Sequence, residues 1–196
     1  MAPALPKPNL SFAEYANAEE ASDEKHEFLG GEVFAMAGGT PEHAALATAV
    51  SHALGSQLGT QNCRAFSSDL HLVTKSGLGT YPDVAVVCGK LERAADSQRT
   101  ITNPTLIVEV LSASTEAYDR GHKFEHYRTI DTLREYVLVS FREPLIESHT
   151  RNADGSWTSR FAGNGAALTL TSVGATLSVD EIYRGLARVD GVMRLP

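Results

Sequence analysis

Two short segments with continuous apolar runs constrain the fold of this chain more than any other feature. They are YPDVAVVC at residues 81–88 and TLIVEVLS at residues 105–112. A strand that is apolar on both sides has to be covered on both faces, which is typical of a sheet lying between other layers. Along the chain the order is helix, strands, helix, strands, helix, strands. We therefore expect an α/β protein with a mixed central β-sheet flanked by helices.

Capping signals place the helices. Ser11 and Glu14 form a capping box, and Thr40-Pro41 supplies an N-cap followed by proline at the first helical position. Leucine and valine residues recur at helical spacing after Pro41 until Gly59 closes the pattern. We expect helices over residues 12–21, 41–58 and 119–130, and a helical turn near residues 180–184.

Turn residues and alternating patterns place the remaining strands. A hairpin is expected to turn at Gly30–Gly31 and another at Asp154–Gly155. The segment CRAFSSDLHLVTK, residues 63–75, is expected to be one alternating strand, with Asp69 and His71 on the face opposite the leucines. Residues 89–103 are polar and predict a loop, and EYVLVSF predicts a strand.

Length and composition predict one globular domain. The chain has 196 residues, of which 42% are hydrophobic, enough for one domain over residues 1–196 with a flexible segment at 1–10. It shows neither a secretory signal nor an apolar run long enough to span a bilayer, so we expect a cytoplasmic protein without membrane contact. The spacing of Cys63 and Cys88 predicts two free thiols in a reducing compartment.

Two acids stand where apolar residues are expected. Glu109 shares a strand face with Ile107 and Leu111, and Asp83 begins the other apolar strand. A buried carboxylate has to be paired, protonated or bound to a metal ion. Mg²⁺ takes one or two carboxylates and keeps several waters, so the pair predicts a metal site. The alternatives are a salt bridge from Glu109 to Arg120 or Lys123, and a simple strand-start role for Asp83.

A series of sequence blocks resembles a known family. The blocks are YPDVAVV, VEVLSASTEAYDRGHKFEHYR and LREYVLV, with HEFLGGEVFAM, GGTPEH and LSVDEIY around them. Together they resemble the Uma-two family of restriction endonucleases, a branch of the PD-(D/E)XK nuclease superfamily. The resemblance implies a restriction-endonuclease-like fold, with Asp83 and Glu109 as the metal-binding acids.

The resemblance also implies a displaced catalytic lysine. The superfamily pattern has lysine two residues after the glutamate, where this chain has Leu111. The matching residue is Lys123, which would orient the attacking water or stabilise developing negative charge. Asp119, Lys123 and Tyr127 are spaced to share one helix face. The alternative is a surface pair between Asp119 and Lys123, with Tyr127 in the core.

Several further residues match the family less specifically. Glu27 is assigned as an additional catalytic acid. Glu32, His43 and Asp69 are candidates near the metal, with solvent-facing or helix-terminus roles as the alternatives. His122 and His126 have helical spacing but are more simply explained as solvated residues. The strand over EYVLV continues into Ser140, where an acid is expected, and this departure favours a weakened member.

These observations predict a Mg²⁺- or Mn²⁺-dependent endonuclease that cuts DNA, acting as a homodimer. The rival is a non-catalytic binding or regulatory protein on the same fold, favoured by the net charge of −7 and by Ser140. Hydrolysis of sugars by paired carboxylates is disfavoured by an aromatic content of only 7%. A phosphate-facing surface is expected from six basic residues: Arg120, Lys123, Arg128, Arg134, Arg142 and Arg151.

Overall fold

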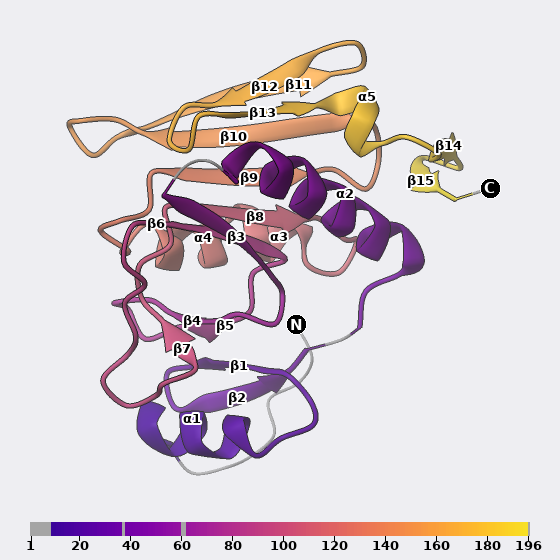
Figure 1. The fold of residues 1–196 in the computed structure, drawn as a ribbon. Coiled ribbons are helices and arrows are strands. Elements are labelled where there is room, and N and C mark those ends of the chain that lie inside the picture. The colour runs from indigo at the N-terminus through magenta and orange to yellow at the C-terminus, as the bar shows by residue number, and fades with distance from the viewer. Residues whose placement is uncertain (1–8, 37, 60–61, 196) are drawn as a thin grey trace.

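The computed structural model describes residues 9–36, 38–59 and 62–195 (Figure 1). Its centre is a six-stranded sheet with the order β11-β10-β9-β8-β6-β3. Strands β8 and β9 are parallel and the other neighbours are antiparallel, so the sheet is mixed, as expected. The strands are β3 (Cys63–Ser67), β6 (Val84–Cys88), β8 (Leu106–Val110), β9 (Glu135–Val139), β10 (Leu145–Arg151) and β11 (Trp157–Gly163).

Both faces of this sheet are covered, which explains the continuous apolar strands. Helix α2 (Pro41–Leu58), the β12–β13 hairpin (Ala167–Leu170 and Ala175–Ser178) and the short α5 (Val179–Ile182) pack on one face. Helices α3 (Glu116–Arg120) and α4 (His122–Tyr127) lie over the other. Alternate residues of β8 therefore enter two separate cores, with Val108 facing α2 and Ile107 facing α4.

A second sheet stands apart from the first, towards the bottom of Figure 1 with α1 (Phe12–Glu20) against it. Its order is β2-β1-β5-β4-β7, and it contains the hairpin expected at Gly30–Gly31. Its strands are β1 (His26–Leu29), β2 (Glu32–Ala35), β4 (His71–Val73), β5 (Gly79–Thr80) and β7 (Thr100–Ile101). A last hairpin joins β14 (Ala187–Val189) to β15 (Val192–Arg194).

The capping predictions are confirmed. The side chain of Ser11 accepts from the Glu14 N–H while Glu14 bonds back to Ser11, and Thr40 caps α2 with Pro41 in its first turn. The hairpin predicted around Asp154–Gly155 forms between β10 and β11. Of the segment expected to be flexible, residues 1–10, residues 1–8 lie outside the described residues. No helix in the described ranges is long and apolar enough to cross a membrane.

Three elements differ from the prediction. Residues 63–75 form two strands, because a turn at Ser68–Asp69 sends β4 into the second sheet. The loop expected over residues 89–103 contributes the short strand β7. The helix expected from Asp119 to Ile130 is broken at Gly121, whose φ of −113° and ψ of −101° are not helical.

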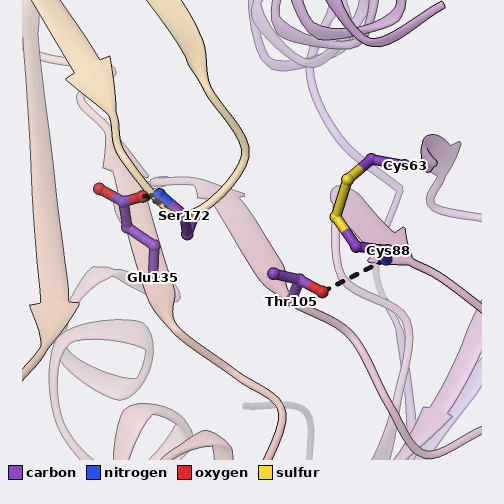
Figure 2. The surroundings of a disulfide bond; sticks show 5 residues. All are labelled: Cys63, Cys88, Thr105, Glu135 and Ser172. Atoms are coloured by element: carbon purple, nitrogen blue, oxygen red, sulfur yellow. Dashed lines mark hydrogen bonds between the residues drawn. A yellow bond between two sulfur atoms is a disulfide. The ribbon is translucent and has the colours of Figure 1, made fainter. Parts of the chain in front are cut away.

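The prediction of two free thiols is wrong. Cys63 and Cys88 are direct partners in the antiparallel β3–β6 register and form a disulfide, with their Cα atoms 3.9 Å apart (Figure 2). The backbone N–H of Cys88 donates to the Thr105 hydroxyl at 3.3 Å. The spacing of the two cysteines in the sequence carries no sign of the pairing, because strand register alone places them opposite one another.

Loss of this disulfide is expected to destabilise the fold without touching the strand ends that carry the acids. The two cysteines are 25 residues apart, and closing a loop of that length stabilises a protein by about 3 kcal/mol through the unfolded state. Urea unfolding of the oxidised protein, the reduced protein and a Cys63→Ser/Cys88→Ser variant measures the difference. Equal midpoints for the three samples would show that the bridge contributes nothing to stability.

Candidate active site

Strand register brings Asp83 beside Glu109. Val84 pairs with Val108 in the antiparallel β6–β8 ladder, so the residue before Val84 lies opposite the residue after Val108. The Asp83 N–H donates to Glu109 Oε2 at 3.3 Å, and the Val110 N–H donates to Asp83 Oδ2 at 2.8 Å. The two acids singled out in the sequence therefore lie at the same level of adjacent strands.

Lys123 reaches the same place from α4. Its side chain is only 6% exposed, and its Nζ lies 3.0 Å from Glu109 Oε1 and 3.1 Å from Glu27 Oε1. The alternative pair with Asp119 is present at 3.8 Å, but both residues are buried, so its expected position on the surface is wrong. The Glu109–Lys123 ion pair anticipated from the sequence is present, so the lysine belongs to the carboxylate cluster.

Glu27 enters the cluster from β1 in the second sheet. Its Oε1 accepts from the Thr80 hydroxyl as well as contacting Lys123, and the residue is 8% exposed. The second sheet thus supplies one wall of the site. The break at Gly121 does not separate the helical residues, because Asp119 at the end of α3 and Lys123 at the start of α4 both face inward.

Tyr127, the last residue of α4, orients the Glu109 carboxylate. Its hydroxyl donates to Glu109 Oε1 at 2.6 Å, and the ring is fully buried. The sequence placed Tyr127 either on the site's helix face or in the core, and the structure shows both roles together. Lys123 and Tyr127 contact the same oxygen, so they fix the orientation of the Glu109 carboxylate.

His43 approaches Asp83 from the first turn of α2. Its Nε2 lies 3.2 Å from Asp83 Oδ2, and its backbone N–H donates to Thr40. The hydrogen bond to Asp83 raises the pKa of His43, despite partial burial. The sequence allowed His43 either a helix-terminus role or a role in the site. The structure places it in the first turn of α2 and also beside Asp83.

Other candidates lie away from the cluster. Glu32 is exposed on β2. Asp69 is 85% exposed in the turn before β4 and pairs with Lys25. His122 is exposed, and His126 bonds to Ser76 at the other end of α4.

The two departures from the superfamily pattern have structural roles. Leu111 is 1% exposed and packs in the core around Tyr127. Ser140 lies just after β9, where an acid is expected; its carbonyl accepts from Tyr183 and its hydroxyl from the Arg142 N–H. Ser140 therefore stabilises the β9–β10 turn.

Burial and mutual repulsion control the charge of the cluster. Burial raises the pKa of Glu109 to about 8, and Asp83 and Asp119 act in the same direction while Lys123 opposes them. Burial disfavours the charge of Lys123, but Glu109, Glu27 and Asp119 together raise its pKa well above the ordinary value. Burial also raises the pKa of Asp119. Three carboxyl groups surround the buried ammonium group and Asp83 lies beside one of them, an arrangement that attracts further positive charge.

A divalent cation fits this donor set. Within the described residues Asp83 Oδ1 has no hydrogen-bond partner, and Glu109 Oε2 accepts only the long bond from the Asp83 N–H. Asp83 is also the more accessible acid, with 17% of its side chain exposed. Over the same ranges no group of three His, Cys, Asp or Glu side chains forms a complete metal cage. Two carboxylate ligands supplemented by water are the pattern that Mg²⁺ prefers.

Glu135 shows what a purely structural buried acid looks like in this fold. It is completely buried, and one oxygen accepts from the Thr150 hydroxyl. The other accepts from both the N–H and the hydroxyl of Ser172 (Figure 2). Neutral donors thus satisfy both oxygens of Glu135. Glu109 differs because it lies among other carboxylates and a lysine.

A mixed sheet covered by helices, with acids on adjacent strands and a lysine paired with one of them, defines a restriction-endonuclease-like protein. The Uma2 family model, described as "Putative restriction endonuclease", matches residues 12–180. The chain therefore belongs to the Uma2 family, which confirms the resemblance found in the sequence.

The chain is also similar to two proteins of Synechocystis and to one solved structure. The chain is 40% identical to "Uncharacterized protein slr1290" of Synechocystis over 94% of this chain and 97% of the relative. It is 37% identical to "Uncharacterized protein sll1609" of the same organism, over 76% and 84% of the two chains. A crystal structure from Anabaena variabilis, titled a "putative nuclease", has a TM-score of 0.62 at 15% identity, covering 82% of this chain and 90% of that one. At that identity the likeness shows the fold.

Proposed function

We propose that this protein is a divalent-metal-dependent endonuclease that hydrolyses phosphodiester bonds in DNA. The observation that carries the proposal is the convergence of Asp83, Glu109 and Lys123 at one end of the central sheet. Phosphodiester hydrolysis depends mainly on positioning and charge neutralisation, which a few fixed carboxylates and one cation can supply. Membership in a family of restriction-endonuclease-like nucleases supports the same reaction.

Asp83 and Glu109 would hold Mg²⁺ or Mn²⁺. The bound metal would polarise the phosphoryl group and make a water more acidic near neutral pH. Lys123, held between Glu109 and Glu27, would donate hydrogen bonds to the water or to the developing negative charge. Glu27 keeps the ammonium group oriented, and His43 and Tyr127 fix the carboxylates of Asp83 and Glu109. A nuclease of this kind often needs two copies to cut both strands, so we also propose a homodimer.

Cleavage of supercoiled plasmid with Mg²⁺ or Mn²⁺ tests this proposal. Wild type is expected to nick the plasmid only with metal, and Asp83→Asn and Glu109→Gln are expected to lose at least about a hundredfold in rate, because each removes a ligand charge. Asp69→Asn and Glu32→Gln are matched controls, since both change exposed acids outside the cluster. These two variants are expected to cut like wild type.

Two outcomes would contradict the nuclease proposal. Equal nicking by wild type and both site variants would assign the activity to something other than this cluster. No metal-dependent cutting by a folded wild type would favour a binding or regulatory role, which Ser140 and the acidic net charge already support.

A further inference from the structure

The six basic residues expected to face phosphate separate into three groups. Lys123 is buried in the carboxylate cluster. Arg120 and Arg142 both bond to Glu116, and Arg120 also bonds to Glu147, so acids already neutralise this pair. The remaining three, Arg128, Arg134 and Arg151, gather at the other end of α4 and β9.

Arg151 is the centre of this gathering. Its backbone N–H donates to the Arg134 carbonyl at 2.8 Å, and its guanidinium donates to the carbonyl of Arg128. The guanidinium carbon also lies 4.9 Å from the centre of the Trp157 ring, the single tryptophan of the chain. We call Arg128, Arg134, Arg151 and Trp157 the Arg151 patch. Three separate segments of the chain meet here.

Neighbouring acids cancel the positive charge of the Arg151 patch only in part. Within the described ranges, neither Arg134 nor Arg151 has an acidic group within ion-pair distance. Arg128 pairs with the exposed Glu125 at 3.0 Å, and nearby Asp131 pairs with Lys75. Partial burial and the charges of Arg134 and Arg128 lower the pKa of Arg151, while the charge of Asp131 opposes them. Gathering like charges is unfavourable, and a bound anion would relieve it.

The Arg151 patch lies on the same face of the sheet as the carboxylate cluster. Arg151 pairs with Trp157 in the β10–β11 register, and Trp157 packs against Phe124 of α4, which lies over the face that carries Glu109. Leu138 is the partner of Glu109 in the β8–β9 register. Four residues of strand separate Arg134 from Leu138, a distance of about 13 Å. That distance corresponds to about four base pairs along a DNA strand.

We propose that the Arg151 patch binds the sugar-phosphate backbone of duplex DNA beside the segment that is cut. The inference rests on the proposed function for its substrate, but it assigns a separate surface. Arginine suits this role because its planar guanidinium donates paired hydrogen bonds to phosphate oxygens. The whole chain carries a net charge of −7, so repulsion from the rest of its surface would direct DNA to this local patch.

Duplex binding measured by fluorescence anisotropy over a range of salt concentrations, in EDTA to prevent cutting, tests the surface. For each phosphate contact, the affinity for DNA varies with the salt concentration to a power of about −0.9. Loss of one contact in Arg134→Ala is therefore expected to weaken binding by close to tenfold at about 0.1 M salt. The slope of log affinity against log salt should also fall by about 1. Arg134→Ala/Arg151→Ala should double both the logarithmic loss and the change in slope.

Arg160→Ala is the matched control. Arg160 is exposed on the same strand as Trp157, but it lies an odd number of residues away and so points to the opposite face. It is expected to bind duplex like wild type. Arg151→Ala also removes a contact to Arg128, so thermal melting is used to check that this variant is folded. The Arg134 side chain makes no hydrogen bond or ion pair among the described residues, so Arg134→Ala removes no such contact.

The outcomes separate this inference from the proposed catalysis. The assignment would be overturned if Arg134→Ala and a folded double variant bound duplex with the affinity and salt slope of wild type. It would also be overturned if the wild-type protein bound no duplex. Asp83→Asn should retain the affinity measured in EDTA while losing cutting. Patch-dependent binding by a protein that never cuts would refute the catalysis and leave the surface assignment intact.

Discussion

Replacing Lys123 by methionine is expected to destabilise the protein by about 3–5 kcal/mol and to abolish metal-dependent nicking. The ammonium group is buried and contacts Glu109 and Glu27 at 3.0 and 3.1 Å, with Asp119 at 3.8 Å. Removal of one member of a buried ion pair leaves uncompensated charge in a medium that solvates it poorly. Urea unfolding at pH 8.5, where Glu109 is mostly ionised, measures the loss, and plasmid nicking measures the catalytic effect.

Lys90→Met is the control for this substitution, because Lys90 is exposed and remote from the carboxylates. A second variant, Lys123→Met/Glu109→Gln, tests the cause. Since it removes both charges, its destabilisation should be smaller than the sum of the single changes. Strict additivity, or a Lys123→Met variant as stable as Lys90→Met, would show that the ion pairs do not control stability at this site.

Glu109→Gln is expected to eliminate cutting while making the protein less sensitive to pH. The folded-state pKa of Glu109 is about 8, compared with an ordinary value of 4.5, so the folded protein holds a proton that the unfolded chain releases. The stabilising effect of that proton is complete below about pH 4.5 and disappears as the pH rises through 8. Wild type should therefore lose on the order of 1 kcal/mol per pH unit within this window.

Glutamine cannot ionise, so the variant should lack this slope. As the pH rises, the free energy of unfolding of Glu109→Gln should therefore increase relative to that of wild type. Urea unfolding at several values between pH 5 and pH 8.5 tests the prediction, with Glu32→Gln as the exposed control. Parallel curves for wild type and Glu109→Gln would contradict the raised pKa.

Metal binding should show the opposite dependence on pH in wild type. A carboxylate ligand has to be ionised, so Mn²⁺ affinity is expected to rise with pH towards about 8 and then level off. Isothermal titration of Mn²⁺ provides a readout that is independent of cutting.

The sequence predicted the elements that depend on neighbouring residues. Caps at Ser11 and Thr40, the glycine turn at residues 30–31 and the two apolar strands each arise from signals within a few positions. It also identified Asp83 and Glu109, because a carboxylate in a doubly covered strand is conspicuous without any structure. The role of Lys123 came from the family resemblance, since helical spacing alone equally allowed a surface pair.

Only the tertiary structure decided which distant residues meet. Strand register paired Cys63 with Cys88, and packing of the second sheet brought Glu27 to Lys123. A turn at Asp69 removed that acid from the site, and the chain's path gathered Arg128 and Arg134 around Arg151. Local propensity and periodicity act over one or two turns of backbone, whereas these contacts depend on the register and packing of whole elements, which no short stretch of sequence contains.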